Sequence, residues 1–421
     1  MTSKLATHRY LEAAHERVVI FDGAFGTYIQ SRGLSADDFG GPELEGCNEL
    51  LAITRPEIIA EMHSEFLEIG VDVIETATFG AFAVPLGEYN IAHRATEINL
   101  AAARIAREVA DSYSTPSKPR WVAGSIGPGT KFASLGQITY QELLEAFAEQ
   151  AAALIQGGVG ILLIETVYDL LGAKAAINGC RSAMKACGKT LPIQLQITIE
   201  TNGRMLTGTE TPAALHALAP LGIDMIGLNC ATGPAEMSEH LRVLSQTTEM
   251  PIACLPNAGL PRVEGTEAVY DLTPDQLATY HEQFITELGV SVVGGCCGTT
   301  PAHLLAVIDR CAHLIPATRT PEAASSITSI YSPVTLKQDT AFLMISERTN
   351  ANGSKKFRDL MVAEEWDACM QMARQQVTEG AHAVDLCVDY VGRDGTRDMD
   401  ELARRFATGV AAPLILDSTE P

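Results

Sequence analysis

Three of the ten cysteines differ from the others in their surroundings along the chain. Cys230 lies in GLNCATG, and Cys296 and Cys297 lie in GGCCGTT, so all three follow an apolar run and have glycine within a few residues. Thiolates are preferred zinc ligands. Three protein ligands with one vacant position are typical of a catalytic zinc site, whereas a structural site fills all four positions. The pattern therefore predicts a zinc centre, with a vicinal disulfide or three unrelated buried cysteines as the alternatives.

A zinc ion with three thiolates carries about one net negative charge, so it polarises carbonyl groups and water poorly. It is better suited to binding an incoming thiol, which has an ordinary pKa of about 8.5 and is mostly protonated at neutral pH. Coordination removes the thiol proton and leaves an electron-rich sulfur. The expected reaction is attack of that sulfur on a methyl group.

Two carboxylates also end apolar runs, Asp22 in FDGAFGT and Glu165 in LLIET. A buried carboxylate needs a cationic or hydrogen-bonding partner, and the ammonium group of an amino-acid substrate would be one. We therefore expect both carboxylates to bind a substrate. The alternative is that Asp22 caps the turn after it and that Glu165 pairs with a nearby Lys or Arg.

Backbone and amide groups beside these residues are further candidates. In DGAFGT, the glycines allow backbone N–H groups at Gly23 and Ala24 to approach the carboxylate of a substrate. Asn229, next to Cys230, either orients a ligand or hydrogen-bonds its own loop. Glu75, in VIETATFG, ends another apolar run and is open to the same two interpretations as the other carboxylates.

These residues need elements that bring them to one place. Over residues 1–315, eight short runs of β-branched and aliphatic residues alternate with stretches that repeat apolar residues at helical spacing. Near-continuous apolar strands are typical of a parallel sheet covered on both faces, and eight such units in about 300 residues predict a closed (β/α)8 barrel of the TIM type. A doubly wound open sheet is the alternative. The runs lie at 18–23, 71–80, 121–128, 159–166, 192–200, 224–233, 251–259 and 290–299.

The expected barrel would bring distant residues together. Chemistry in such barrels lies at the carboxyl ends of the strands, and only one strand separates the sixth from the eighth in a closed ring. Adjacent residues in a regular strand point to opposite faces, so Cys296 and Cys297 can share one ion only if the backbone leaves strand geometry there. Gly294, Gly295 and Gly298 allow that departure.

Residues 316–340 are rich in Ser, Thr, Pro and Ala, which predicts a linker. Apolar runs resume at 342–350, 382–390 and 413–421, with helical stretches between them. Three strands cannot close a barrel. Residues 341–421 are therefore interpreted as the first units of a second, incomplete α/β barrel that is cut short.

The amino-acid composition argues against some classes of binding partner. Thirty basic residues against 52 acidic ones give a formal net charge of −22, which argues against nucleic acid or an anionic membrane surface. No apolar run reaches the length of about 18–20 residues that a membrane span needs, and the N-terminus has no signal-peptide core. We therefore expect a cytoplasmic protein with reduced thiols rather than disulfides.

Two groups of motifs resemble known families. DGAFGT, GLNC and GGCCGTTPAHL resemble the homocysteine S-methyltransferase domain. ISERTNANGSKKFRDL, VDLCVDY and LILDSTEP resemble the pterin-binding domain of cobalamin-dependent methionine synthase. Betaine-dependent and plant-type homocysteine methyltransferases share the first group and lack the second, so the two together indicate the N-terminal part of the cobalamin-dependent family.

The resemblance implies roles for individual residues. It implies zinc bound by Cys230, Cys296 and Cys297, with homocysteine held near Asp22 and Glu165. The zinc-bound homocysteine thiolate would attack the methyl group of methylcobalamin, itself remethylated from 5-methyltetrahydrofolate, to give methionine.

The resemblance also implies that 5-methyltetrahydrofolate binds near Asn350, Asp385 and Asp417. Carboxylates suit the amide and amino edge of a pterin, and Asn suits hydrogen bonding near N5 without a full charge. The alternative is that these carboxylates cap helices. The Asp-x-His-x-x-Gly motif of a cobalamin-binding module is absent from the sequence. We therefore expect methylcobalamin to be bound by a domain outside this chain, in cis or in trans, and folate to bind weakly or not at all.

Two other functions are compatible with the sequence. One is a stand-alone homocysteine methyltransferase that uses betaine or S-methylmethionine as the methyl donor. The other is a non-catalytic zinc-storage or scaffold module. Activity with those donors and none with methylcobalamin would favour the first, and zinc content without a homocysteine-dependent change around the metal would favour the second.

Overall fold

The computed structural model describes residues 2–264, 267–322 and 324–419. Contacts divide the chain into two compact units, Met1–Thr207 with Leu218–Glu322 and Gly208–Ala217 with Ala323–Pro421. The first unit contains every residue predicted to bind zinc or homocysteine. The second contains every residue predicted to bind folate.

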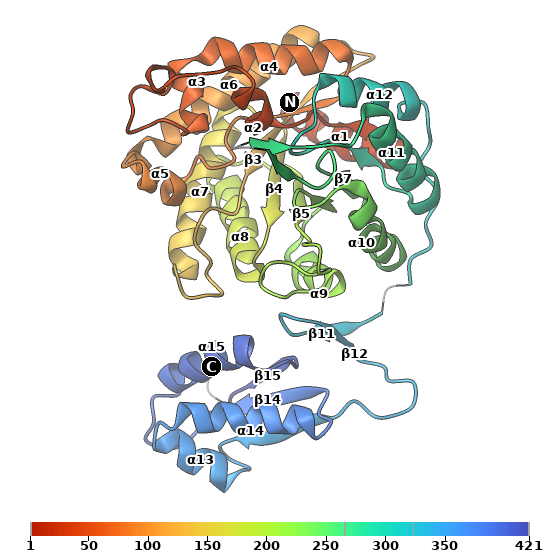
Figure 1. The fold of residues 1–421 in the computed structure, drawn as a ribbon. Coiled ribbons are helices and arrows are strands. Elements are labelled where there is room, and N and C mark those ends of the chain that lie inside the picture. Colours follow the sequence, from red (N-terminus) through yellow and green to blue (C-terminus); the bar gives the residue numbers. More distant parts are fainter. Residues whose placement is uncertain (1, 265–266, 323, 420–421) are drawn as a thin grey trace. The chain divides into compact units, whose positions relative to one another are not determined.

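Eight parallel strands form a closed barrel in the first unit (Figure 1). They pair in the order β1-β10-β7-β6-β5-β4-β3-β2, and a parallel bridge between Phe21 and Val73 joins the first of these strands to the last. The predicted (β/α)8 barrel is confirmed, and the open sheet is wrong because the ring closes. The strands are β1 (Val19–Ile20), β2 (Val73–Glu75), β3 (Trp121–Ile126), β4 (Ile161–Val167), β5 (Ile193–Ile197), β6 (Met225–Asn229), β7 (Ile252–Leu255) and β10 (Val292–Val293).

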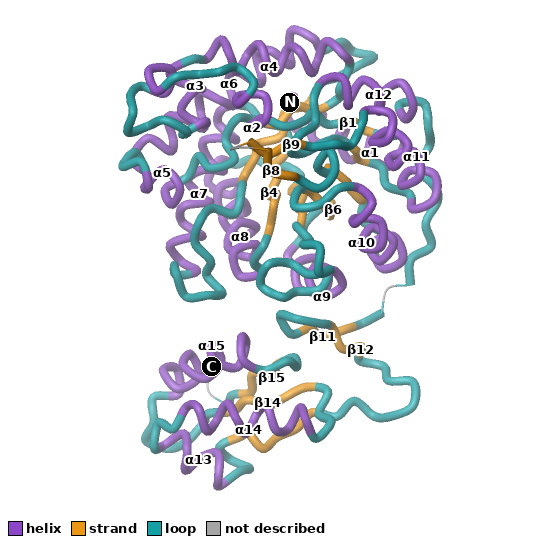
Figure 2. Tube along the Cα trace, in the orientation of Figure 1, coloured by secondary structure: helices purple, strands orange, loops and turns teal. Residues whose placement is uncertain are grey.

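Helices surround the barrel (Figure 2). They are α2 (Phe25–Gln30), α3 (Leu51–Thr54), α4 (Pro56–Ile69), α5 (Ala83–Glu88), α6 (Ala95–Tyr113), α7 (Tyr140–Gly157), α8 (Leu170–Cys187), α10 (Pro234–Thr247), α11 (Pro274–Leu288) and α12 (Pro301–Cys311), while α9 (Thr211–Leu218) crosses the boundary between the two units. At the start of α7, the N–H groups of Thr139 and Glu142 each donate to the side chain of the other residue, which satisfies two donors that the first turn leaves free. In the described ranges, no helix is long and apolar enough to cross a membrane.

Helix α1 (Thr2–Glu16) closes the amino-terminal end of the barrel. Tyr10 is fully buried and packs edge-on against Phe21 and Trp121, with ring centroids 6.4 and 5.8 Å away. Its hydroxyl lies 3.6 Å from Sδ of Met225. Because Trp121 and Met225 begin their strands, these contacts leave the carboxyl ends of the strands open for a site.

Strands β8 (Arg262–Glu264) and β9 (Glu267–Val269) form an antiparallel hairpin between β7 and α11. The sequence does not predict this hairpin, because it is short and its apolar residue Val263 is 79% exposed. Without a buried face, a strand has no apolar alternation to mark it.

The segment predicted as a linker, 316–340, has two parts. Residues 316–322 belong to the first unit, where the guanidinium of Arg319 donates to the carbonyl oxygen of Thr248 at 2.6 Å. The remainder belongs to the second unit and contains an antiparallel hairpin of β11 (Ser326–Thr328) and β12 (Pro333–Thr335).

A three-stranded parallel sheet in the order β13-β14-β15 forms the rest of the second unit (Figure 1). Its core contains the fully buried side chains of Phe357, Leu386, Leu402 and Phe406. The predicted alternation of strands and helices after the linker is confirmed. The elements are β13 (Ile345–Asn350), α13 (Lys355–Val362), α14 (Trp366–Thr378), β14 (Ala383–Cys387), α15 (Gly395–Gly409) and β15 (Leu414–Asp417).

Candidate metal centre

Cys230, Cys296 and Cys297 converge at the carboxyl ends of the barrel strands. Cys230 follows β6 and the other two follow β10, and only β7 lies between these strands. Sγ of Cys297 is 3.9 Å from Sγ of Cys230 and 4.0 Å from Sγ of Cys296. All three sulfurs lie within 4.8 Å of one another, and each residue is half-buried. The three side chains are therefore close enough to bind one ion.

The spacing of the sulfurs matches what zinc requires. Sulfurs held about 2.3 Å from one tetrahedral zinc ion lie about 3.8 Å apart. The two measured distances are 3.9 and 4.0 Å. Thiolates also favour zinc over magnesium or calcium, which prefer oxygen ligands. The donor set and its geometry therefore fit a zinc ion with three protein ligands.

The backbone leaves strand geometry at both cysteine turns. Cys230 and Ala231 have φ angles of 59° and 55°, in the left-handed region that only a few per cent of non-glycine residues occupy. Such conformations cost about 1–3 kcal/mol each and cluster at functional sites. Gly298, directly after the two adjacent cysteines, has a φ of 79°. The departure from strand geometry expected at the adjacent cysteines is therefore present.

Tyr270 is a residue of this site that the sequence does not reveal. It follows the β8–β9 hairpin, is half-buried, and packs directly on Gly298, the residue after Cys297. Hydrogen bonds from Cys230, Cys296 and Tyr270 lower the pKa of the Cys297 thiol to about 3. Hydrogen bonds with Cys230 and Cys297 raise the pKa of the Cys296 thiol well above its usual range.

Two carboxylates adjoin each other at the ends of β1 and β2. Asp22 is buried, and its Oδ2 accepts a hydrogen bond from the N–H of Glu75 at 3.0 Å. Burial raises the pKa of Asp22 well above its usual range, and burial with the charges of Glu165 and Asp22 does the same for Glu75. Among the described residues, Oδ1 of Asp22 has no hydrogen-bond partner and no Lys or Arg offsets either charge. A ligand ammonium group would stabilise the charged carboxylates.

Glu165, near the end of β4, is held through both of its oxygens. Oε1 accepts a hydrogen bond from Oγ of Ser125 at 2.5 Å, and Oε2 accepts one from Nδ2 of Asn229 at 3.2 Å. Burial raises the pKa of Glu165 to about 7, while the hydrogen bond from Ser125 acts in the opposite direction. Oδ1 of Asn229 accepts a hydrogen bond from the N–H of Thr166 at 2.8 Å. Because Asn229 precedes Cys230, it connects this carboxylate to the first cysteine turn.

Gly23 and Ala24 lie between Asp22 and α2. A Cβ at Gly23 would lie 2.7 Å from Oγ1 of Thr299, so the backbone there packs directly against the turn that carries the adjacent cysteines. The carbonyl oxygen of Ala24 accepts a hydrogen bond from the N–H of Tyr28 at 3.1 Å, in the first turn of α2. The structure thus brings this loop beside the cysteines.

Asn257 is a second residue that the sequence does not single out. It lies just beyond β7, the strand between the two that carry the cysteines, and its N–H donates to the carbonyl oxygen of Thr232 at 3.1 Å. Its Oδ1 is buried and, within the described ranges, has no hydrogen-bond partner. The site therefore has an amide oxygen available to a ligand or a water molecule.

The three residues predicted to bind folate lie together in the second unit. Asn350 ends β13, Asp417 ends β15, and Asp385 lies in β14 between them. Nδ2 of Asn350 donates to Oδ2 of Asp385 at 2.9 Å and is 3.4 Å from Oδ2 of Asp417. Asp385 is buried and Asp417 is exposed. The three side chains form a polar group at the carboxyl end of the sheet, where α/β proteins bind ligands.

Family models match both units of the chain. The family described as homocysteine S-methyltransferase matches residues 19–311, and the family described as pterin binding enzyme matches residues 346–421. The metallated form of the homocysteine methyltransferase MmuM from Escherichia coli has a TM-score of 0.59 and 21% sequence identity, and the match covers 72% of this chain and 99% of that one. Its oxidised form gives a TM-score of 0.57 at 21% identity over 70% of this chain and 96% of that one. These two matches show a shared fold.

Two methionine synthases are similar over nearly the whole chain. The enzyme from Mycobacterium tuberculosis (strain ATCC 25618 / H37Rv) is 48% identical over 410 residues, which are 97% of this chain and 34% of the relative. The enzyme from Mycobacterium leprae (strain TN) is 48% identical over 422 residues, 98% of this chain and 35% of the relative. The chain thus spans about a third of the length of these relatives. Because the first family match covers most of the chain, at residues 19–311, the chain belongs to the homocysteine S-methyltransferase family.

Proposed function

We propose that this chain is the homocysteine-activating part of a methionine synthase and that it works with zinc. The observation that carries the proposal is the convergence of three cysteine sulfurs at 3.9 and 4.0 Å spacing. Beside them lie buried carboxylates that, in the described part of the chain, have no cationic partner. Homocysteine has both groups that such a site would bind, a thiol for the vacant metal position and an ammonium group for the carboxylates.

The cysteines would hold the metal. With Cys230, Cys296 and Cys297 as ligands, bound zinc would supply a centre at which a thiol loses its proton at neutral pH while its sulfur stays nucleophilic.

The carboxylates and the first loop would orient the amino-acid end of the substrate. Asp22 and Glu165 would bind the ammonium group, with Asn229 keeping Glu165 in place through its hydrogen bond at 3.2 Å. Backbone N–H groups at Gly23 and Ala24 would bind the substrate carboxylate. Together these contacts would leave the sulfur directed at the metal position.

The methyl donor in this proposal is methylcobalamin, carried by a cobalamin-binding domain in cis or in trans. Its methyl group would come from 5-methyltetrahydrofolate, bound in the second unit near Asn350, Asp385 and Asp417. The match to the pterin-binding family at residues 346–421, together with the similarity to two methionine synthases, supports a folate-derived methyl group over betaine or S-methylmethionine.

Metal analysis combined with methyl-transfer assays tests the proposal. We expect one zinc ion per chain and homocysteine-dependent demethylation of added methylcobalamin, which is lost on treatment with a chelator and restored by zinc. Parallel assays with betaine and S-methylmethionine separate the stand-alone methyltransferase from the cobalamin-dependent one. Full activity after complete zinc removal would contradict the mechanism, and zinc without any methyl transfer would indicate a zinc-binding module.

An Asp22→Asn variant tests whether the carboxylates bind the ammonium group. The amide keeps the acceptor for the N–H of Glu75 but removes the charge. We expect the dissociation constant for homocysteine to rise about 10–100-fold, because a hydrogen bond to a charged group contributes about 1.5–3 kcal/mol. Binding of 4-mercaptobutyrate, which lacks the amino group, should change little. Equal weakening of both ligands, measured by calorimetry on the zinc-loaded protein, would exclude a role in ammonium binding.

A further inference from the structure

The peptide unit between Cys297 and Gly298 has both of its polar groups bound to distant parts of the chain. The carbonyl oxygen of Cys297 accepts a hydrogen bond from the N–H of Ala258 at 2.9 Å. The N–H of Gly298 donates to Oγ1 of Thr27 at 3.0 Å. Because rotation of this unit would turn the Cys297 side chain, the two hydrogen bonds restrict the direction of its sulfur.

Tyr270 holds the same turn from another side. A Cβ at Gly298 would lie 2.3 Å from Cγ and 2.7 Å from Cβ of Tyr270, so the aromatic residue packs directly on the glycine. Gly298 directly follows Cys297, so Tyr270 restricts the backbone of the turn next to that cysteine.

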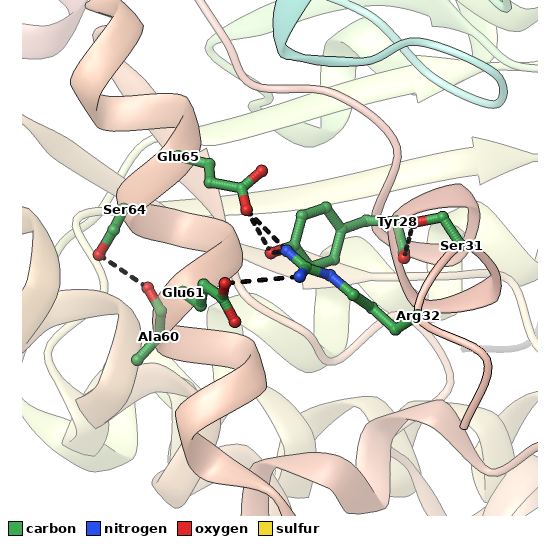
Figure 3. Close-up of polar contacts among 7 residues, drawn as sticks. All are labelled: Tyr28, Ser31, Arg32, Ala60, Glu61, Ser64 and Glu65. Carbon is green, nitrogen blue, oxygen red and sulfur yellow. Dashed lines mark hydrogen bonds and ion pairs between the residues drawn. The ribbon is translucent and has the colours of Figure 1, made fainter. Parts of the chain in front are cut away.

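Tyr28 and Arg32 contact Glu65 of α4 in a cluster that joins that helix to α2, the helix that carries Thr27 (Figure 3). The guanidinium of Arg32 lies over the ring of Tyr28, 4.3 Å from its centroid, and pairs with Glu65 at 2.6 Å. The hydroxyl of Tyr28 donates to the same carboxylate at 3.0 Å. Exposed ion pairs contribute only about 0.2–1 kcal/mol, so the main effect of the cluster is to orient the helix. Because Tyr28 follows Thr27, the cluster keeps the Thr27 hydroxyl against the cysteine turn.

We propose that Thr27 and Tyr270 are positioning residues that orient the Cys297 sulfur toward the other two sulfurs before metal binds. Thr27 accepts a hydrogen bond from the N–H of Gly298, and Tyr270 packs on the same glycine. The inference rests on the proposed function, because it requires that the three sulfurs bind zinc. Without these two residues, zinc binding must also order the turn at Cys297 and Gly298, which makes the free energy of binding less favourable.

Two variants test this role. Thr27→Val removes the hydroxyl that accepts from Gly298 at nearly constant shape, and Tyr270→Ala removes the ring that packs on Gly298. We expect each to raise the zinc dissociation constant about 10-fold and the double variant to raise it further, up to about 100-fold, as for other groups that orient metal ligands. Competition with a chromophoric chelator measures the constant on the full chain.

Two control variants test whether a change in zinc affinity is specific to these contacts. Thr27→Ser keeps a hydroxyl and is expected to retain the wild-type zinc affinity. Tyr113→Phe removes a hydroxyl that donates to Glu68 at the exposed surface and is expected to change nothing. Zinc affinity within twofold of the wild type in both Thr27→Val and Tyr270→Ala would overturn the inference. Retention of zinc by Cys297→Ser would instead overturn the proposed function.

Discussion

A Cys297→Ser variant is expected to lose zinc and, with it, homocysteine-dependent methyl transfer. Cys297 is the central member of the three, with its sulfur 3.9 and 4.0 Å from the others. A serine hydroxyl is a far weaker acid than a thiol, so it does not supply the anionic ligand that zinc needs. Because even replacement of groups around metal ligands costs about 10–100-fold in affinity, we expect a loss of more than about 100-fold here. Metal content per chain and methyl transfer are measured on the same samples.

Cys187→Ser is the matched control for this variant. Cys187 ends α8, is half-buried, and is also a free cysteine. It lies outside the group of three sulfurs, so its replacement should leave both zinc content and methyl transfer unchanged. One zinc ion per chain in Cys297→Ser, at wild-type affinity, would show that this cysteine is not a ligand.

A Gly298→Ala variant is expected to distort the same turn without removing any ligand. At its φ of 79° an added Cβ is strained by about 1–2 kcal/mol. The Cβ would also lie 2.3 Å from Cγ of Tyr270, and overpacking of this kind costs about 1–3 kcal/mol. We therefore expect the free energy of unfolding to fall by about 2–5 kcal/mol. Since relief of the clash moves either Tyr270 or the cysteine turn, zinc affinity should fall more than about 10-fold.

Gly136→Ala separates the effect of backbone strain from the effect of the clash with Tyr270. Gly136 has a φ of 71°, close to that of Gly298, but apart from its chain neighbours no heavy atom of the described residues lies within 4 Å of an added Cβ. Its replacement should cost only the backbone strain of about 1–2 kcal/mol and leave zinc affinity unchanged. Urea unfolding gives the stability of both variants, and chelator competition gives their zinc affinity. Equal stability losses with unchanged zinc affinity would mean that Tyr270 adapts without moving the cysteines.

The periodicity of the sequence is sufficient to predict the barrel. Every residue of β4 is buried, and its first four residues, Ile161–Ile164, form an apolar run that marks the strand locally. All parallel strands end at the same rim, and for this reason residues at strand ends, such as Cys230 and Asp22, can be selected before the structure is known. Of the hairpin residues whose burial is described, none is buried, so the β8–β9 hairpin has no apolar pattern in the sequence and is missed.

The sequence does not reveal which side chains contact these strand-end residues. The hydrogen bond between Gly298 and Thr27 joins residues 271 positions apart, and that between Asn229 and Glu165 joins residues 64 positions apart. The sequence by itself determined which elements form and which residues stand at their carboxyl ends. Only the tertiary structure decided that Tyr270 and Thr27 hold the cysteine turn, because side chains of separate elements meet only when the ring of strands has closed.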